Sequence, residues 1–170
     1  DLVDRYHYDL DRSLQAVEGF VKIAPVYYVV GNHEVSLNDV PTITALLEDV
    51  GVHVLMNDSI PYYKNGAGID IVGIDDPLNG KATDEMLEEA LRNKAHDFQL
   101  LLAHSPEFYE TYADYDIDVT FNGHAHGGQI RIPGIGGVIE HQMNLFPKHI
   151  EGVEYHHQLT QVISRGLGNS

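Results

Sequence analysis

The chain has 170 residues, of which 43% are hydrophobic and 21% charged, an ordinary composition for one globular domain with its own core. Its formal net charge of −16 argues against broad electrostatic binding to nucleic acid, which needs a basic surface to displace counterions from phosphates. The absence of cysteine excludes thiolate catalysis, disulfides and iron–sulfur ligation. Neither a signal peptide nor a membrane span is visible, and this leaves cellular location and membrane association open.

Helix and strand patterns alternate along much of the chain, which is typical of α/β domains. Apolar residues at helical spacing predict helices over residues 13–23, 41–50, 83–95 and 106–113. Apolar and β-branched runs predict strands over residues 26–30, 52–56, 60–64, 69–74, 98–103 and 159–163. The part from residue 118 onward is rich in strand patterns and glycine. No linker or repeat interrupts the pattern, so we predict a single domain over residues 1–170.

Three short runs place metal-capable side chains directly after apolar, strand-like segments. They are Gly31-Asn32-His33-Glu34, Ala103-His104-Ser105-Pro106 and Gly123-His124-Ala125-His126. Side chains that follow buried strands gather at the carboxyl edge of a sheet, where open α/β sheets bind ligands. The chain also opens with Asp1, which adds a carboxylate. Such a mixture of oxygen and imidazole donors suits Mn, Fe or Zn, and two ions sharing a carboxylate would explain so many ligands.

Each run alone also has a structural explanation. A turn with a helix-capping asparagine explains the first run about as well, and His104 alone fits a strand-end histidine bonded to backbone. In the third run, His124 and His126 share a face only if the segment is extended. Asp75-Asp76-Pro77 is explained by a turn before proline and is not taken as a metal pair. The metal site therefore rests on the combination of runs.

In order and spacing these runs resemble the calcineurin-like metallophosphoesterase superfamily, whose motifs are D-x-H, G-D-x-x-D, G-N-H-[DE], a lone H and G-H-x-H. The last three motifs are complete here, and the second is present from Asp1 to Asp4. The run GHAHGGQ is most similar to a small bacterial branch of predicted phosphohydrolases. The resemblance covers nearly the whole chain. It implies an α/β four-layer sandwich of two mixed sheets flanked by helices, with residues 118–164 largely in the second sheet.

The resemblance also implies that the domain is incomplete at both ends. The D-x-H motif is absent from the sequence, and the first residue is itself a ligand position. In the family, the glycine-rich loop that corresponds to residues 164–170 leads into a further strand. We therefore expect the first strand, which carries D-x-H, and the last strand to lie outside these 170 residues.

The resemblance assigns a metal role to five residues. Asp1 bridges two divalent transition-metal ions, with Mn favoured over Fe or Zn. Asn32, His104 and His124 hold the second ion, and His126 serves the first. In the family, hydroxide bridging the two ions attacks phosphorus.

Three further residues receive roles in catalysis. His33 is the general acid that protonates the leaving group, and Asp4 orients it. Arg5 is placed to contact the substrate phosphate, but Tyr6 stands where the family usually has glycine, and this departure weakens the assignment of Arg5.

The sequence thus predicts a binuclear metal-dependent hydrolase of phosphoester bonds, either a phosphodiesterase or a phosphomonoesterase. Its expected substrate is a small-molecule or lipid-linked phosphoester. The alternative is a non-catalytic protein-binding scaffold on the same fold, because some members have lost ligands and D-x-H is absent here. An intact D-x-H in the upstream coding sequence would favour the enzyme.

Overall fold

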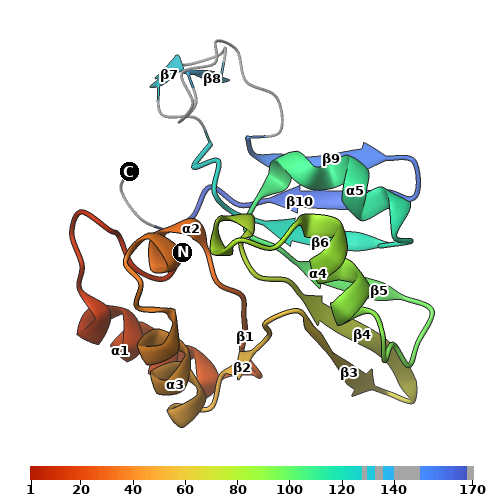
Figure 1. The fold of residues 1–170 in the computed structure, drawn as a ribbon, viewed down its shortest axis with the longest axis horizontal. Coiled ribbons are helices and arrows are strands. Elements are labelled where there is room, and N and C mark those ends of the chain that lie inside the picture. The colour runs from red at the N-terminus through yellow and green to blue at the C-terminus, as the bar shows by residue number, and fades with distance from the viewer. Residues whose placement is uncertain (128–129, 133–135, 140–149, 168–170) are drawn as a thin grey trace.

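The computed structural model describes residues 1–127, 130–132, 136–139 and 150–167. Gly128 and Gln129 of the final motif, and residues 168–170, lie outside these ranges, so the interpretation of those residues remains a prediction. The described chain forms an α/β structure in which a six-stranded sheet and a two-stranded parallel sheet lie between two groups of helices (Figure 1).

The larger sheet has six strands in the order β3-β4-β5-β6-β10-β9. Their bounds are Asp58–Lys64, Ala67–Gly73, Gln99–Leu102, Val119–Asn122, Leu159–Ile163 and Gly152–His156, respectively. Strands β4, β5, β6 and β10 run parallel, whereas the edge strands β3 and β9 are antiparallel to their neighbours. The carboxyl ends of four neighbouring strands therefore lie at one edge of this sheet.

The other described sheets are small. Strand β1 (Tyr27–Tyr28) pairs in parallel with β2 (His53–Val54), and β7 (Ile130–Ile132) pairs with β8 (Gly136–Ile139). A Cβ atom added at Gly73 would lie 2.3 Å from Leu55 Cβ, so the β1–β2 pair packs directly on β4.

The division of strands between the sheets differs from the expected one. The smaller of the two packed sheets is a parallel pair, not a mixed sheet, in the described residues. Of the strands after residue 118, β6, β9 and β10 lie in the six-stranded sheet, where β10 extends the parallel ladder of β6 with Thr160 opposite Val119, whereas β7 and β8 form a separate pair.

Two apolar cores separate the layers. Helices α1 (Leu10–Val21) and α3 (Val40–Asp49) bury Val17, Ile43 and Leu47 against the β1–β2 side. Helices α4 (Thr83–Ala90) and α5 (Tyr109–Asp114) bury Met86, Leu87 and Tyr112 against the opposite face of the large sheet. The order helix–sheet–sheet–helix confirms the predicted α/β four-layer architecture (Figure 1). The remaining short helices are α2 (Asn32–Ser36), η1 (Pro77–Asn79) and η2 (Pro106–Phe108).

Two helix ends differ from the sequence pattern for identifiable reasons. Helix α1 begins three residues early because the Asp9 side chain accepts a hydrogen bond from Arg12 N at 3.1 Å and caps the helix. Helix α4 ends at Ala90 instead of Ala95. The backbone N–H groups of Ala95 and His96 donate to Asp70 Oδ2, at 2.8 and 2.9 Å, so a long-range contact draws this segment out of the helical path.

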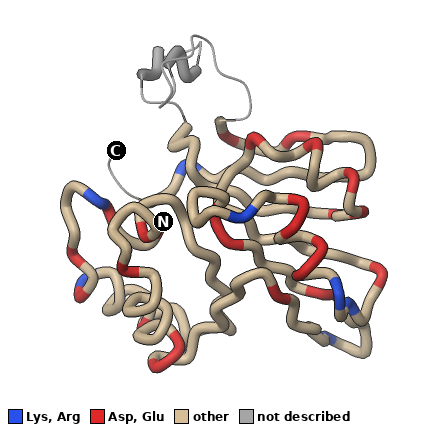
Figure 2. The backbone as a smooth tube through the Cα atoms, viewed as in Figure 1, with Lys and Arg blue, Asp and Glu red and all other residues tan. Residues whose placement is uncertain are grey.

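Acidic positions are spread over both helix layers and the outer strands, whereas Lys and Arg positions are few (Figure 2). This distribution agrees with the acidic composition and shows no basic stripe in the part of the chain described. No helix among the described residues combines the length and the apolar character needed to cross a membrane.

Candidate metal centre

Four of the five predicted ligands come together at the carboxyl edge of the sheets. Asn32 begins α2 just after β1, His104 follows β5, and His124 follows β6. The N-terminus lies beside α2 (Figure 1), which brings Asp1 to the same edge. Segments that are far apart in the sequence therefore meet at one point.

The polar atoms of this cluster face one another at short range. His104 Nε2 lies 2.9 Å from Asn32 Oδ1 and 3.2 Å from Asp1 Oδ2. His124 Nδ1 lies 3.0 Å from Asn32 Oδ1 and 3.1 Å from His104 Nε2. The side chains of His104 and Asp1 are only 6% and 14% exposed, so the cluster is largely shielded from water.

The chemistry of this donor set fits a metal ion. Two oxygens and two ring nitrogens converge, and each of these atoms has a lone pair that can ligate a metal when the imidazole is in the appropriate tautomer. A divalent cation would match all of them, and mixed N and O ligands suit Mn, Fe or Zn. Counting only His, Asp and Glu side chains, no group of three in the described ranges is placed to hold a metal. The amide oxygen of Asn32 is therefore the atom on which the set converges.

The electrostatic setting of His104 favours ligation. Burial, together with the nearby His124 ring, lowers the pKa of His104 to about 3. The Asp1 α-amino nitrogen lies 3.3 Å from His104 Nδ1. A metal-binding histidine must be neutral, so this environment keeps the ring in its ligand form at ordinary pH.

The loop that carries the last two histidines is not extended. Strand β6 ends at Asn122, and both His124 and His126 have left-handed backbone, with φ of 61° and 52°. Ala125 N donates to Gly123 O at 2.7 Å, which closes a tight turn between them. His124 joins the cluster through this bend. The predicted metal contact of His126 remains a prediction.

His33 lies beside the cluster but is held by backbone groups. Its N–H donates to Asp1 Oδ1 at 2.9 Å, and its ring Nδ1 lies 3.2 Å from the Val3 carbonyl oxygen. The predicted orienting residue, Asp4, instead accepts from Tyr6 N at 2.8 Å and lies 3.4 Å from His7 Nδ1. Among the described contacts, the Val3 carbonyl and the Arg5 N–H lie at the His33 ring, and the orienting role of Asp4 remains a prediction.

Arg5 lies against the residue that departs from the family pattern. Its Nη2 donates to Tyr6 Oη at 2.7 Å, and its guanidinium lies 4.7 Å from the centre of the Tyr6 ring. The Nε atom of Arg5 is buried and makes no hydrogen bond to a described residue. The predicted phosphate contact of Arg5 remains a prediction.

Glu34 lies beside the candidate centre, and the sequence predicted no role for it. It is fully buried, and its carboxylate accepts from Leu2 N at 2.7 Å, Val3 N at 3.1 Å and Gly31 N at 2.9 Å. Burial raises the pKa of Glu34, whereas the hydrogen bonds from these N–H donors lower it. Glu34 thus joins the segment of Asp1 to that of Asn32. The acidic last position of G-N-H-[DE] was the available signal.

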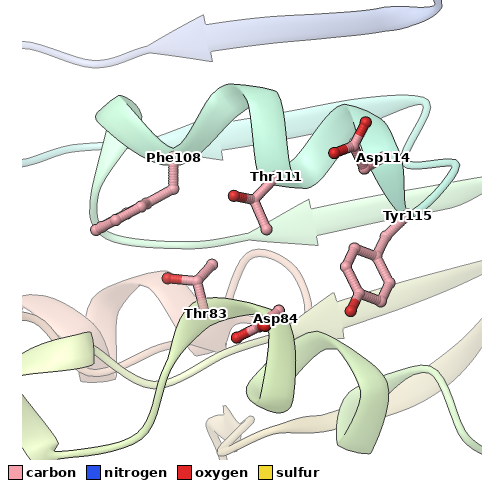
Figure 3. Close-up of a pocket in the computed structure, with 6 residues that line it drawn as sticks. All are labelled: Thr83, Asp84, Phe108, Thr111, Asp114 and Tyr115. Atoms are coloured by element: carbon pink, nitrogen blue, oxygen red, sulfur yellow. The ribbon is translucent and has the colours of Figure 1, made fainter.

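A groove of about 490 Å³ lies elsewhere, between α4 and α5 (Figure 3). Its lining residues are Thr83, Asp84, Phe108, Thr111, Asp114 and Tyr115. None of them belongs to the candidate centre, and the two carboxylates would repel a phosphoester. The groove therefore plays no part in the candidate chemistry.

Comparisons with known proteins support the family that the sequence resembles. The sequence model of the calcineurin-like phosphoesterase family matches residues 1–128. The chain is 29% identical over 171 residues to the uncharacterized metallophosphoesterase YkoQ of Bacillus subtilis (strain 168), covering 95% of this chain and 62% of YkoQ. It is 30% identical over 115 residues to the phosphodiesterase YaeI of Escherichia coli (strain K12), covering 66% of this chain and 41% of YaeI. The chain thus spans less than two thirds of these relatives.

A solved structure shows the same fold. The sulfate thiohydrolase SoxB of Thermus thermophilus, in complex with glycerol, superposes with a TM-score of 0.56 at 14% identity, covering 91% of this chain and 30% of that one. At this identity the likeness concerns the fold alone. With the family match over residues 1–128 and the ligand runs assembled at one sheet edge, the chain belongs to the calcineurin-like phosphoesterase family.

Proposed function

We propose that this chain is the catalytic part of a binuclear metal-dependent phosphoesterase. The observation that carries the proposal is the convergence of Asn32, His104 and His124 on one point, 2.9 to 3.1 Å apart. Family membership supports phosphoester hydrolysis in general, and the naming of YaeI as a phosphodiesterase favours a diester. The substrate is a small-molecule or lipid-linked phosphoester, since the acidic surface disfavours nucleic acid.

The proposed metal set consists of Asp1, Asn32, His104, His124 and His126. Two divalent ions, with Mn favoured, would supply a hydroxide nucleophile near neutral pH and neutralise phosphate charge. The chain's own contribution is to preform the ligand geometry. Glu34 and Gly31 hold the Asp1 segment, and the loops after β5 and β6 hold the imidazoles in a shielded place.

The geometry of His33 suits the proposed general acid. The ring Nδ1 lies 3.2 Å from Val3 O and 3.4 Å from Arg5 N, which leaves Nε2 as the ring atom that would face a leaving group and, in the imidazolium form, give it a proton. The His33 backbone N–H also fixes one oxygen of Asp1. One residue would thereby connect the metal-bridging carboxylate to the departing oxygen.

Kinetics with two leaving groups test this function. An alkoxide needs a proton in the transition state, whereas nitrophenolate leaves with little help. We expect His33→Ala to cut Mn²⁺-dependent hydrolysis of alkyl phosphoesters by about 100- to 10,000-fold and to affect nitrophenyl esters far less. Asp1→Ala should abolish both activities. His7→Ala is the matched control, because His7 lies on the same segment with its side chain 89% exposed.

Two results would contradict the proposal in different ways. Equal losses for both esters in His33→Ala would mean that the histidine positions phosphate or water instead of giving a proton. No hydrolysis by the wild-type protein, across a broad panel of substrates and metals, would favour the alternative of a protein-binding scaffold. In that case, calorimetric titration of Mn²⁺ should also show no uptake.

A further inference from the structure

We propose that Asn122 is a positioning residue that sets the spacing of His104 and His124. The inference rests on the proposed metal-dependent function. Asn122 is the last residue of β6, two positions before His124, and is 4% exposed. Its Nδ2 donates to the carbonyl oxygens of Ala103 at 2.8 Å and Ser105 at 3.3 Å. One amide group therefore binds the backbone on both sides of His104.

The amide of Asn122 is fixed in this orientation by its neighbours. Its Oδ1 accepts from Gln161 Nε2 at 3.0 Å, and the same Nε2 donates to Pro106 O at 2.8 Å. Turning the amide over would place Oδ1 against two carbonyl oxygens and Nδ2 against a donor. The Ser105 carbonyl also accepts from Tyr112 Oη at 2.7 Å. Strands β6 and β10 and helix α5 thus hold the loop after β5 through one buried polar network.

The backbone ladder carries this arrangement to the ligands. Ala103 N donates to Phe121 O at 3.2 Å, and Gly123 N donates to His104 O at 3.0 Å. Beyond Gly123 the chain turns into the left-handed bend. The network therefore fixes the two ends from which the imidazoles project, and their ring nitrogens lie 3.1 Å apart. Groups that orient ligands in this way contribute to metal affinity without touching the ion.

A comparison of two buried amides on the same sheet tests the proposal. Asn122→Leu removes the amide beside the ligands. Gln99→Leu removes an equally buried amide at the opposite end of β5, where Nε2 donates to His96 O at 2.5 Å. Both variants should have a lower free energy of unfolding than wild type when metal-free, as measured by urea unfolding in the presence of a chelator. Only Asn122→Leu should raise the Mn²⁺ dissociation constant in calorimetric titration, by about 10- to 100-fold.

The electron paramagnetic resonance spectrum of bound Mn²⁺ gives a second measurement, which we expect to change in Asn122→Leu and not in Gln99→Leu. If Asn122→Leu does not fold, Gln161→Leu tests the inference instead, because it removes the group that orients the Asn122 amide. The Mn²⁺ affinity of Gln161→Leu should fall below that of wild type, by a smaller factor than expected for Asn122→Leu. If the folded Asn122→Leu variant bound Mn²⁺ as tightly as wild type, or if Gln99→Leu lost as much Mn²⁺ affinity as Asn122→Leu, the positioning role of Asn122 would be overturned and the proposed function would not be affected. A wild-type protein that takes up no Mn²⁺ would overturn the proposed function as well.

Discussion

The two ends of the large sheet hold clusters of similar composition but opposite character. At the amino end of β5, Asp70 is buried, and its carboxylate accepts from His96 Nδ1 at 2.9 Å, from two backbone N–H groups and from Gln99 Nε2 at 3.3 Å. At the carboxyl edge, Asn32 Oδ1 and ring nitrogens of His104 and His124 lie 2.9 to 3.1 Å from one another.

The difference lies in the atoms that surround the oxygen ligand of each cluster. The Asp70 carboxylate accepts from protein donors, among them the backbone N–H groups of Ala95 and His96, so it needs no cation and joins a loop to the sheet. At Asn32 the atoms that converge are an amide oxygen and two ring nitrogens, each of which can bind a divalent cation. A histidine beside an oxygen ligand therefore indicates a structural contact where protein donors satisfy that oxygen, and a candidate metal centre where several ligand atoms converge on one point.

The largest effects are expected when one histidine of each cluster, His104 or His96, is replaced with alanine. His104→Ala removes a ligand and should weaken Mn²⁺ binding by more than about 100-fold, beyond the loss typical of outer-shell partners. His96→Ala should leave Mn²⁺ affinity unchanged and lower the free energy of unfolding by about 1–3 kcal/mol, because a buried carboxylate loses a partner. Calorimetric titration and urea unfolding of both variants measure the two effects. Loss of Mn²⁺ affinity in His96→Ala would contradict the distinction between a structural cluster at Asp70 and a metal centre at Asn32.

A pair of glycines gives a finer test. A Cβ atom at Gly31 would lie 2.2 Å from Asp1 Oδ1 and 2.7 Å from Asp1 N, and one at Gly68 would lie 2.2 Å from His96 Nε2. Each alanine substitution should therefore cost about 1–3 kcal/mol of stability by overpacking. Only Gly31→Ala moves a predicted ligand, so only this variant should also weaken Mn²⁺ binding. Equal Mn²⁺ affinity in the two variants would contradict the assignment of Asp1.

The smallest expected effect concerns acid stability at the structural cluster. Burial alone raises the pKa of Asp70, but hydrogen bonds from His96, Ala95 and Gln99 outweigh it and lower the pKa below the ordinary 3.8. The ionised carboxylate therefore stabilises the fold fully above that value, and this stability is lost as pH falls through 3.8 and the lower folded pKa. Asp70→Asn should thus be less stable than wild type at pH 7, with a narrower difference near pH 3. A constant difference across this range would exclude the carboxylate as its source.

Local patterns predicted much of the fold, and long-range contacts account for the differences. Helix α3 was predicted almost to the residue because Pro41 stands in its first turn and Gly51, with φ of 95°, follows its end. The early end of α4 depends on Asp70, which is distant in sequence. The parallel pairing of β10 with β6 likewise depends on partners that periodicity cannot identify.

The candidate site shows the same division. Side-chain type and order predicted that Asn32, His104 and His124 would gather, because each follows a strand. The bend at His124 and the position of the Val3 carbonyl at the His33 ring depend on backbone geometry, which carries no side-chain signature. Asn122 likewise appears in the sequence only as a strand end, and its contacts to Ala103 and Ser105 require the three-dimensional arrangement.

The left-handed backbone at His124 and His126 has an evolutionary consequence. Glycine and asparagine adopt that conformation most readily, so replacing either histidine with one of them would relax the loop while deleting an imidazole. If the proposed function holds, stability of the loop and metal ligation favour different residues at these two positions. Relatives without a metal centre should then carry Gly or Asn here more often, and relatives that bind metal should keep the GHAH run.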